Sequence, residues 1–417
     1  MRVQKCKGTR DLSPEEMNRF RLIEGGFRDC CLKGGYQEIR TPTLEYLHLF
    51  TSTGTLTPGK LSKVYSFLDW DGWSGERVVL RPDATIPVAR SYIDSLGESG
   101  LARLFYVANI FIFEETGKEN REIWQCGVEL IGAGSTVADV ELITLAMDVL
   151  QKLGLKKMEL RLSHSGLIRA LLTRFGLSPQ EQASVFDRIL DGDQTALTGL
   201  TVRTPELSET LTPLLDLKGQ SPGFLRNLKS LFNRDLPEFE PALNNFIDTV
   251  DLLETLGYDY RIDIASGRGF EYYTGVIFQV FAGEEVVAGG GRYDDLIPLI
   301  GGQQVPASGF ALYVDNLMDL ITPEALDGQL PERVLIRYVE DRSETVRESF
   351  RVARCLRDAG YAAELDLGGQ ALTDLRWVVD VQSQPLQFAV TDLTSQKRSE
   401  AINIDEVVVL LGGKGAG

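Results

Sequence analysis

Apolar and polar positions along the chain follow two periods, that of a strand and that of a helix. Met158-Glu159-Leu160-Arg161-Leu162 alternates apolar with polar side chains, as a strand with one buried face does. Short apolar segments predict further strands in the first 325 residues, at 36–42 (ending at a proline), 78–81, 105–108, 128–132, 260–263 and 276–280. The pattern therefore predicts a sheet assembled from segments far apart in the chain.

Helical segments are marked by their ends. Ser13-Pro14-Glu15-Glu16 combines an N-cap serine, a proline in the first turn and a glutamate that completes a capping box, so a helix should begin there and stop at Gly34-Gly35. A second helix is expected at 137–153, before Gly154. Helical periodicity from about 166 to 256 predicts a mainly helical insertion, and it returns at 311–321.

The last part of the chain has a different organisation. Residues 322–331, with two prolines and a glycine, are expected to form a linker. Beyond it, strands are expected at 334–338, 362–366, 388–390 and 407–410, and an amphipathic helix at 343–359. Alternation of strand and helix predicts a small α/β domain with some parallel pairing. We therefore expect two domains, 1–325 and 332–417.

Composition bounds the possible functions. Hydrophobic residues make up 43% and charged residues 25% of the 417 residues, which is typical of a soluble globular protein. No run of about 18 apolar residues occurs, and no apolar stretch follows the N-terminus, so neither a membrane span nor a secretory signal is expected. We predict a cytoplasmic protein. A net charge of −17 argues against general nucleic-acid binding, which needs basic surface.

Cysteine and histidine are too sparse for several kinds of chemistry. The five cysteines form no CxxC pair, so free thiols are expected, and only His48 and His164 could serve a histidine-dependent mechanism. Neither histidine lies in a nucleophile motif. We expect no metal site and no cofactor.

Five segments, each weak alone, resemble the histidyl-tRNA synthetases of class II when taken in order. They are Lys7-Gly8-Thr9-Arg10-Asp11-Leu12 (similar to the KGTRD signature), residues 35–42 (motif 1), Leu80-Arg81-Pro82-Asp83-Ala84-Thr85 (LRPEGT), Arg268-Gly269-Phe270-Glu271-Tyr272-Tyr273-Thr274-Gly275 (RGLDYY), and Gly289-Gly290-Gly291-Arg292-Tyr293-Asp294 (GGRYD). The resemblance implies an α+β fold. Its core is the synthetase-like antiparallel sheet flanked by helices, with the helical insertion, and residues 332–417 resemble the anticodon-binding domain.

The resemblance also implies a histidine pocket. A free amino acid presents an ammonium and a carboxylate, and histidine adds imidazole N–H groups, so its pocket needs acceptors and a cation. By position, the candidate histidine ligands are Asp83, Gln125, Glu129, Arg268, Tyr272 and Tyr273. Asp83 is one methylene shorter than the family's glutamate. From the alternation of residues 125–129 alone, Glu129 could equally be an ordinary strand carboxylate.

Three positions depart from the family where its arginines contact ATP. Ile112 stands in place of the motif 2 arginine, Glu119 in place of a loop arginine, and Asn316 in place of the motif 3 arginine. Tyr313 replaces a glycine that faces the nucleotide. Because activation builds charge on the phosphates, losing three cations should abolish it. The alternative is a synthetase in which Arg121, Arg103 or Lys118 takes over.

A histidine pocket without an ATP site resembles the regulatory subunits of the short-form ATP phosphoribosyltransferases, which act in the first step of histidine biosynthesis. That resemblance implies a non-catalytic subunit that activates a short catalytic partner and confers feedback by histidine. Motif 1, whose proline lies at a dimer interface in the family, implies a homodimer within a hetero-oligomer. Histidine could bind the old synthetase pocket or a subunit boundary.

Two other classes of function remain open on the sequence. One is a divergent histidyl-tRNA synthetase or a related amino-acid ligase. The other is a nucleic-acid-binding or kinase-sensor module in which the C-terminal domain holds tRNA, but residues 331–417 hold 11 basic and 14 acidic residues, a net charge of −3. This charge offers little attraction for tRNA, so tRNA binding is not expected.

Overall fold

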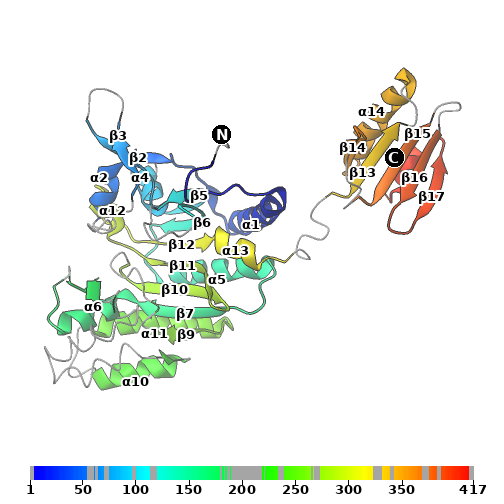
Figure 1. Ribbon diagram of the computed structural model, residues 1–417. Coiled ribbons are helices and arrows are strands. Elements are labelled where there is room, and N and C mark those ends of the chain that lie inside the picture. Colours follow the sequence, from blue (N-terminus) through cyan, green and yellow to red (C-terminus); the bar gives the residue numbers. More distant parts are fainter. Residues whose placement is uncertain are drawn as a thin grey trace. The chain divides into compact units, whose positions relative to one another are not determined.

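The chain forms two compact units, Met1–Ala325 and Leu326–Gly417. The computed structural model describes residues 4–53, 61, 64–69, 75–95, 100–112, 120–178, 181–182, 184–185, 188, 218–219, 221–232, 239–263, 266, 273–322, 331–338, 342–368, 375–382 and 387–412. Figure 1 shows their helices and strands. Within these ranges no helix is both long enough and apolar enough to cross a bilayer.

The first unit is built on a nine-stranded sheet. In spatial order its strands are β1 (Gln37–Glu38), β5 (Ala102–Phe111), β6 (Glu122–Ile131), β12 (Ala307–Tyr313), β11 (Glu285–Arg292), β10 (Val276–Ala282), β7 (Glu159–His164), β9 (Arg261–Asp263) and β8 (Lys218–Gly219). The six central strands, β5 to β7, pair antiparallel. Among the described strands of this sheet, β1 with β5 and β7 with β9 pair parallel. Together with the helices below, this confirms the predicted α+β fold.

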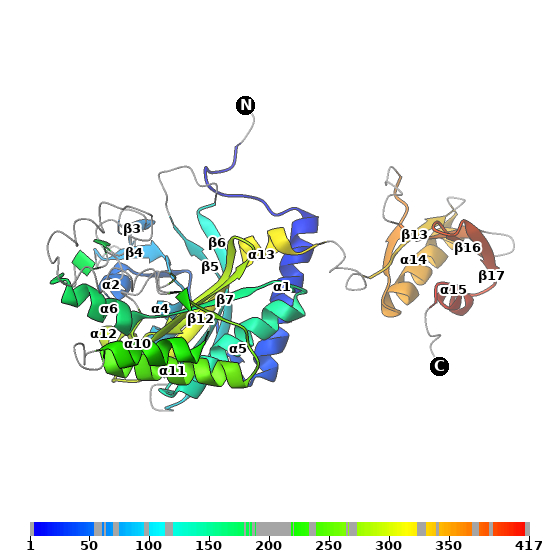
Figure 2. The same cartoon turned by 90° about the horizontal axis from the view of Figure 1, so that it is seen from below.

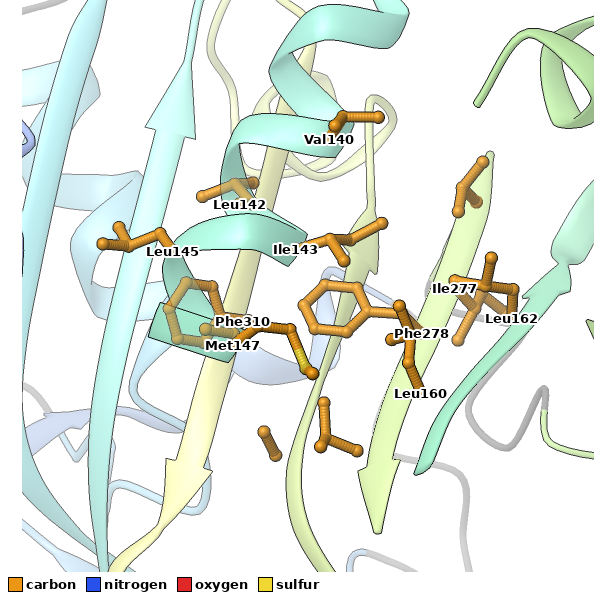
Figure 3. Close-up of a cluster of buried hydrophobic side chains, with 14 of the residues drawn as sticks. Val140, Leu142, Ile143, Leu145, Met147, Leu160, Leu162, Ile277, Phe278 and Phe310 are labelled. Carbon is orange, nitrogen blue, oxygen red and sulfur yellow. The ribbon is translucent and has the colours of Figure 1, made fainter. Parts of the chain in front are cut away.

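One face of this sheet packs against α1 (Pro14–Lys33) and α5 (Thr136–Lys152). The predicted capping box of α1 is present, because the Ser13 hydroxyl accepts the Glu16 N–H at 3.2 Å and the Glu16 carboxylate accepts the Ser13 N–H at 2.7 Å. Apolar side chains of α5, such as Ile143, lie against Phe278 and Phe310 of the strands (Figure 3). This core fixes which side chains point to the opposite face.

The opposite face is bordered by α4 (Thr85–Ser95), α2 (Leu47–Thr51) and α12 (Leu296–Leu299). A three-stranded sheet of β2 (Leu44–Tyr46), β4 (Arg77–Leu80) and β3 (Ser66–Leu68) leads into α4. Helix α4 therefore begins directly after β4, at the LRPDAT segment.

Between β7 and β9 the chain forms α6 (Ser165–Arg174), the short strand β8 of the same sheet, α10 (Pro222–Phe232) and α11 (Glu240–Thr255). Helices α10 and α11 lie side by side (Figure 2). The chain then returns to the sheet, and α13 (Val314–Leu320) follows β12.

The second unit has five strands in the order β14 (Ala362–Leu365), β13 (Arg333–Tyr338), β15 (Trp377–Gln382), β16 (Gln387–Asp392) and β17 (Lys397–Ala401). Strands β14, β13 and β15 pair parallel and the others antiparallel, as the predicted mixture requires. Side chains of α14 (Ser343–Asp358) and α15 (Ile404–Leu410) bury one apolar cluster with the strands.

One predicted element was wrong and two were wrong in part. Residues 407–410 belong to α15 and not to a strand, because Asn403 caps the helix by accepting the Glu406 N–H at 2.8 Å and acidic residues fill its first turn. Residues 311–313 pair with β6 as part of β12, so the helix begins only at Val314. In 36–42 only Gln37 and Glu38 form a strand.

Candidate functional site

The candidate site lies on the sheet face opposite α1 and α5. Side chains alternate along a strand, and Cys126, Val128 and Leu130 of β6 point into the helix-covered core. Gln125, Gly127 and Glu129 must therefore point to the other face. The register continues this face sideways to Tyr106 of β5 and to Gly309, Ala311 and Tyr313 of β12.

Glycines on this face allow neighbouring side chains to lie flat on the sheet. A Cβ on Gly127 would lie 2.1 Å from the Tyr106 ring, and a Cβ on Gly309 would lie 1.9 Å from the Glu129 carboxylate. Neither distance is sterically possible, so both positions require glycine. The glycines thus make room for the Tyr106 ring and the Glu129 carboxylate.

Glu129 is the centre of a buried polar cluster, with 1% of its surface exposed. Its carboxylate accepts a hydrogen bond from the Tyr293 hydroxyl and a longer one, 3.4 Å, from the Tyr106 hydroxyl. Burial raises the pKa of Glu129 to about 8, and the nearby Asp83 charge adds to this, while hydrogen bonds from Tyr293, Thr85 and Tyr106 oppose it. The Glu129 carboxyl is therefore mainly protonated at neutral pH. A bound cation would stabilise its ionised form.

Asp83 lies beside this cluster but already has a structural role. Its Oδ1 accepts the N–H of Ile86 at 2.8 Å, in the first turn of α4. Burial raises the pKa of Asp83, and the backbone N–H groups of Ile86 and Thr85 oppose the rise. The sequence predicted Asp83 as a histidine ligand, and in the structure Asp83 also caps the first turn of α4.

The other predicted histidine ligands divide into described and undescribed positions. Tyr273 lies over the sheet, since a Cβ on Gly291 would lie 2.9 Å from its Cδ1. Gln125 is half-buried at the end of the same face, opposite Tyr313 in the ladder. Glu129, Asp83, Tyr273 and Gln125 are thus all on or beside one sheet face. Arg268 and Tyr272 lie outside the described residues.

The positions that depart from the family are engaged in the fold. The Asn316 side chain donates to the Val286 carbonyl at 2.8 Å, which joins α13 to β11. Ile112 is half-buried against an apolar cluster that includes Tyr106 and Ile110. The Tyr313 hydroxyl lies 3.1 Å from where a Cβ of Gly289 would be, so it lies over Gly289 of β11. Glu119 lies outside the described residues.

Both arginines that could have replaced the missing cations have structural partners. Arg103 points to the helix-covered face, where it forms a bidentate pair with Glu141 of α5 at 3.1 and 2.9 Å. Arg121 donates its backbone N–H to the Gly8 carbonyl at 2.8 Å, and its guanidinium donates to the Tyr65 hydroxyl at 3.1 Å. Arg103 therefore lies on the sheet face opposite the candidate site. Lys118 lies outside the described residues.

Arg81 is a structural residue that the sequence analysis did not single out. Its buried guanidinium donates to Asn109 (carbonyl 2.7 Å, side chain 3.0 Å), to Thr41 (3.1 Å and 3.2 Å) and to the Pro42 carbonyl (3.2 Å). Burial lowers its pKa. Arg81 thus ties the motif 1 segment to the strand that precedes Asp83. Tyr106 and Tyr293 were also missed as partners of Glu129, although Tyr293 lies within the GGRYD-like segment.

In the part of the chain that the structure describes, no group of three or more His, Cys, Asp or Glu side chains is placed to hold a metal ion. His164, one of the two histidines, is buried and burial lowers its pKa to about 4. It is therefore neutral at physiological pH. The candidate ligands that the structure describes are carboxylates, a phenol and an amide.

Glu129 should make stability depend on pH. A carboxyl with a pKa of about 8 when folded and 4.5 when unfolded holds more protons in the folded state between those values. Stability should therefore fall as pH rises through this window, with a slope of up to about 1.4 kcal/mol per pH unit. Denaturant unfolding of wild type and Glu129→Gln at pH 5, 6, 7 and 8 measures it. A wild-type curve parallel to that of the variant would contradict the shift.

The sequence profile of the histidyl-tRNA synthetase family matches residues 8–317. The chain is 51% identical over 412 residues, 99% of each chain, to the ATP phosphoribosyltransferase regulatory subunit of Dehalococcoides mccartyi. It is 36% identical over 379 residues to the histidine–tRNA ligase of Methanocaldococcus jannaschii, covering 88% of this chain and 87% of the ligase.

A solved structure from Bacillus halodurans, described as an ATP phosphoribosyltransferase regulatory subunit/histidyl-tRNA synthetase, superposes with a TM-score of 0.77 at 25% identity, over 92% of this chain and 99% of that one. The fold, together with a site in which glycines on the sheet face leave room for side chains, thus defines a class II protein of the histidyl-tRNA synthetase type. Within that class, the chain belongs to the family of ATP phosphoribosyltransferase regulatory subunits.

Proposed function

We propose that this chain is a non-catalytic regulatory subunit that binds the short catalytic subunit of ATP phosphoribosyltransferase, activates it and makes it sensitive to histidine. One observation carries the proposal. Glu129 is a buried carboxylate with two phenols, which we take as the amino-acid end of the site, whereas Ile112 and Asn316, which stand where arginines of the family contact ATP, offer no cation. A site of this kind can bind an amino acid without activating it.

At the amino-acid end, Glu129 suits the positive charge of a histidine ligand, because a bound cation would favour the ionised carboxylate that burial disfavours. Gln125 offers an amide and Tyr273 a ring over Gly291. Asp83, Arg268 and Tyr272 complete the proposed set of ligands, with Arg268 as the partner of the histidine carboxylate.

At the phosphate end, activation by ATP would have to stabilise charge on the α-phosphate and the pyrophosphate. One preorganised donor contributes roughly 10²–10³ in rate, so two or three absent cations remove most of the acceleration. Tyr313 adds a steric obstacle, since its hydroxyl lies over Gly289 on the sheet surface. This end of the site supports the loss of synthetase activity.

The proposed partners follow from the relatives. Three relatives at 50–51% identity over 99% of the chain are named ATP phosphoribosyltransferase regulatory subunits, and that name implies a catalytic subunit. We also propose that the chain forms a homodimer through the motif 1 segment, inside a hetero-oligomer. Exposed apolar side chains of Leu44 and Tyr46, in β2 just beyond that segment, and of Phe67, in β3 of the same small sheet, are suited to such a contact.

The direct test is reconstitution with a short catalytic subunit. Phosphoribosyl transfer to ATP is measured with the catalytic subunit alone, with this chain added, and with this chain plus L-histidine. Activity should rise when the chain is added and fall when histidine follows. A catalytic subunit whose rate is the same with and without this chain would contradict the proposal.

A divergent histidine–tRNA ligase is the second candidate, favoured by the 36% identity to such a ligase. ATP–pyrophosphate exchange dependent on L-histidine separates the two functions. We expect no exchange above background, with an active histidyl-tRNA synthetase as the positive control. Exchange at a rate typical of a synthetase would establish the second candidate instead.

A further inference from the structure

The first turn of α6 holds the segment that carries Tyr273. The Gly275 carbonyl accepts two hydrogen bonds from Ser165, one from its backbone N–H at 2.9 Å and one from its hydroxyl at 3.0 Å. Ser165 is fully buried, so both bonds are shielded from water. The end of the RGFEYYTG segment is therefore fixed to the start of the helical insertion.

Arg169 adds a second contact one helical turn later. Its guanidinium donates to the Tyr273 carbonyl at 2.8 Å. Residues four apart lie on the same face of a helix, so Ser165 and Arg169 reach the same segment. Tyr273 is held from both sides, because its ring lies over Gly291 and its carbonyl is bound by a charged donor.

The same helix start is joined to α11. The His164 Nδ1 accepts the Gly166 N–H at 3.1 Å, and its Nε2 lies 3.1 Å from the Asn245 Oδ1 of α11. Because Nδ1 is an acceptor, Nε2 must be the donor in the neutral ring. The His164 ring also lies 5.8 Å from the Phe246 ring. A continuous set of buried and partly buried contacts therefore runs from Tyr273 through α6 to α11.

We infer that Arg169 is a positioning residue for the amino-acid ligand, and that α6 transmits the occupation of the site to α11 of the helical insertion. This inference rests on the proposed function, since it takes the ligand to be histidine. Arg169 acts on the ligand through Tyr273 and does not touch it. A ligand that fixes Tyr273 also fixes the carbonyl that Arg169 binds, so ligand and helix stabilise each other.

The experiment compares Arg169→Ala, Arg169→Lys and Arg174→Ala in the full chain. Arg174 is an exposed arginine at the far end of the same helix and is the matched control. L-Histidine affinity is measured by calorimetry, and hydrogen exchange of residues 165–174 and 240–255 is measured with and without histidine. Thermal unfolding without ligand monitors the fold of each variant.

Arg169→Ala should weaken histidine binding about tenfold, because a hydrogen bond from a charged donor is lost. Arg169→Lys should recover part of the affinity, and Arg174→Ala should bind as the wild type does. Histidine should slow exchange in both helices of the wild type but not in α11 of Arg169→Ala. If the wild type binds histidine and Arg169→Ala binds it equally well, the inference is wrong and the proposed function stands. If the wild type binds no histidine, both are wrong.

Discussion

Replacing Glu129 by glutamine should weaken the binding of L-histidine about a hundredfold. Glutamine keeps the volume; its amide oxygen can accept from one tyrosine hydroxyl and its NH2 can donate to the hydroxyl oxygen of the other, so the cluster should still fold. It cannot become an anion, so it loses the charge-assisted contact with a ligand cation, which contributes about 1.5–3 kcal/mol when buried. The variant should therefore lose most of the preference for a cationic ligand that the Glu129 carboxylate supplies.

Titration calorimetry at pH 7 and pH 8 measures the effect. Wild-type affinity should rise with pH as Glu129, whose pKa is about 8, becomes easier to ionise, whereas the variant should show no such rise. Glu285→Gln, an exposed carboxylate at the start of β11, serves as the control and should bind as the wild type does. Equal affinities of wild type and Glu129→Gln would locate histidine elsewhere, for instance at a subunit boundary.

Replacing Arg292 by alanine should lower the free energy of unfolding by about 3–5 kcal/mol. Arg292 is 6% exposed and forms a bidentate pair with Asp139 of α5, at 3.2 and 2.6 Å. It also donates to the Ala133 and Ser135 carbonyls. The variant would leave Asp139 buried without this pair, although burial already raises its pKa to about 6.

Denaturant unfolding at pH 7 tests this prediction, and Arg226→Ala is the matched control. Arg226 also contacts an aspartate, Asp251, but more than half of its side chain is exposed, so its loss should cost less than about 1 kcal/mol. The cost of Arg292→Ala should shrink at pH 5, where Asp139 can be protonated. A cost below 1 kcal/mol for Arg292→Ala at pH 7 would show that the pair does not stabilise the fold.

Much of the fold could be predicted from local signals. The capping box at Ser13 and the glycines after α1 and α5 marked helix ends because caps act within a few residues. Residues 407–410 were misjudged because three valines favour a strand in isolation. Tertiary packing of Val407 and Val408 and the cap at Asn403 outweighed that preference.

The candidate site was only partly predictable. Residues 125–129 alternate along one strand, so Gln125 and Glu129 could be placed on one face from the sequence. Tyr106 comes from the adjacent strand and Tyr293 from a segment more than 160 residues away, and a single sequence contains no signal for such pairings. The cap formed by Asp83 was equally hidden, because it depends on where α4 begins.

The hydroxyl of Tyr313 over Gly289 has a consequence for the history of this chain. On the proposed function, a return to catalysis needs several changes at once. An arginine at 112 would enter an apolar cluster, and an arginine at 316 would break the tie to Val286 while Tyr313 still covered the sheet. On that function, each single reversion should cost stability and restore no activity, so no single substitution would be enough to regain catalysis.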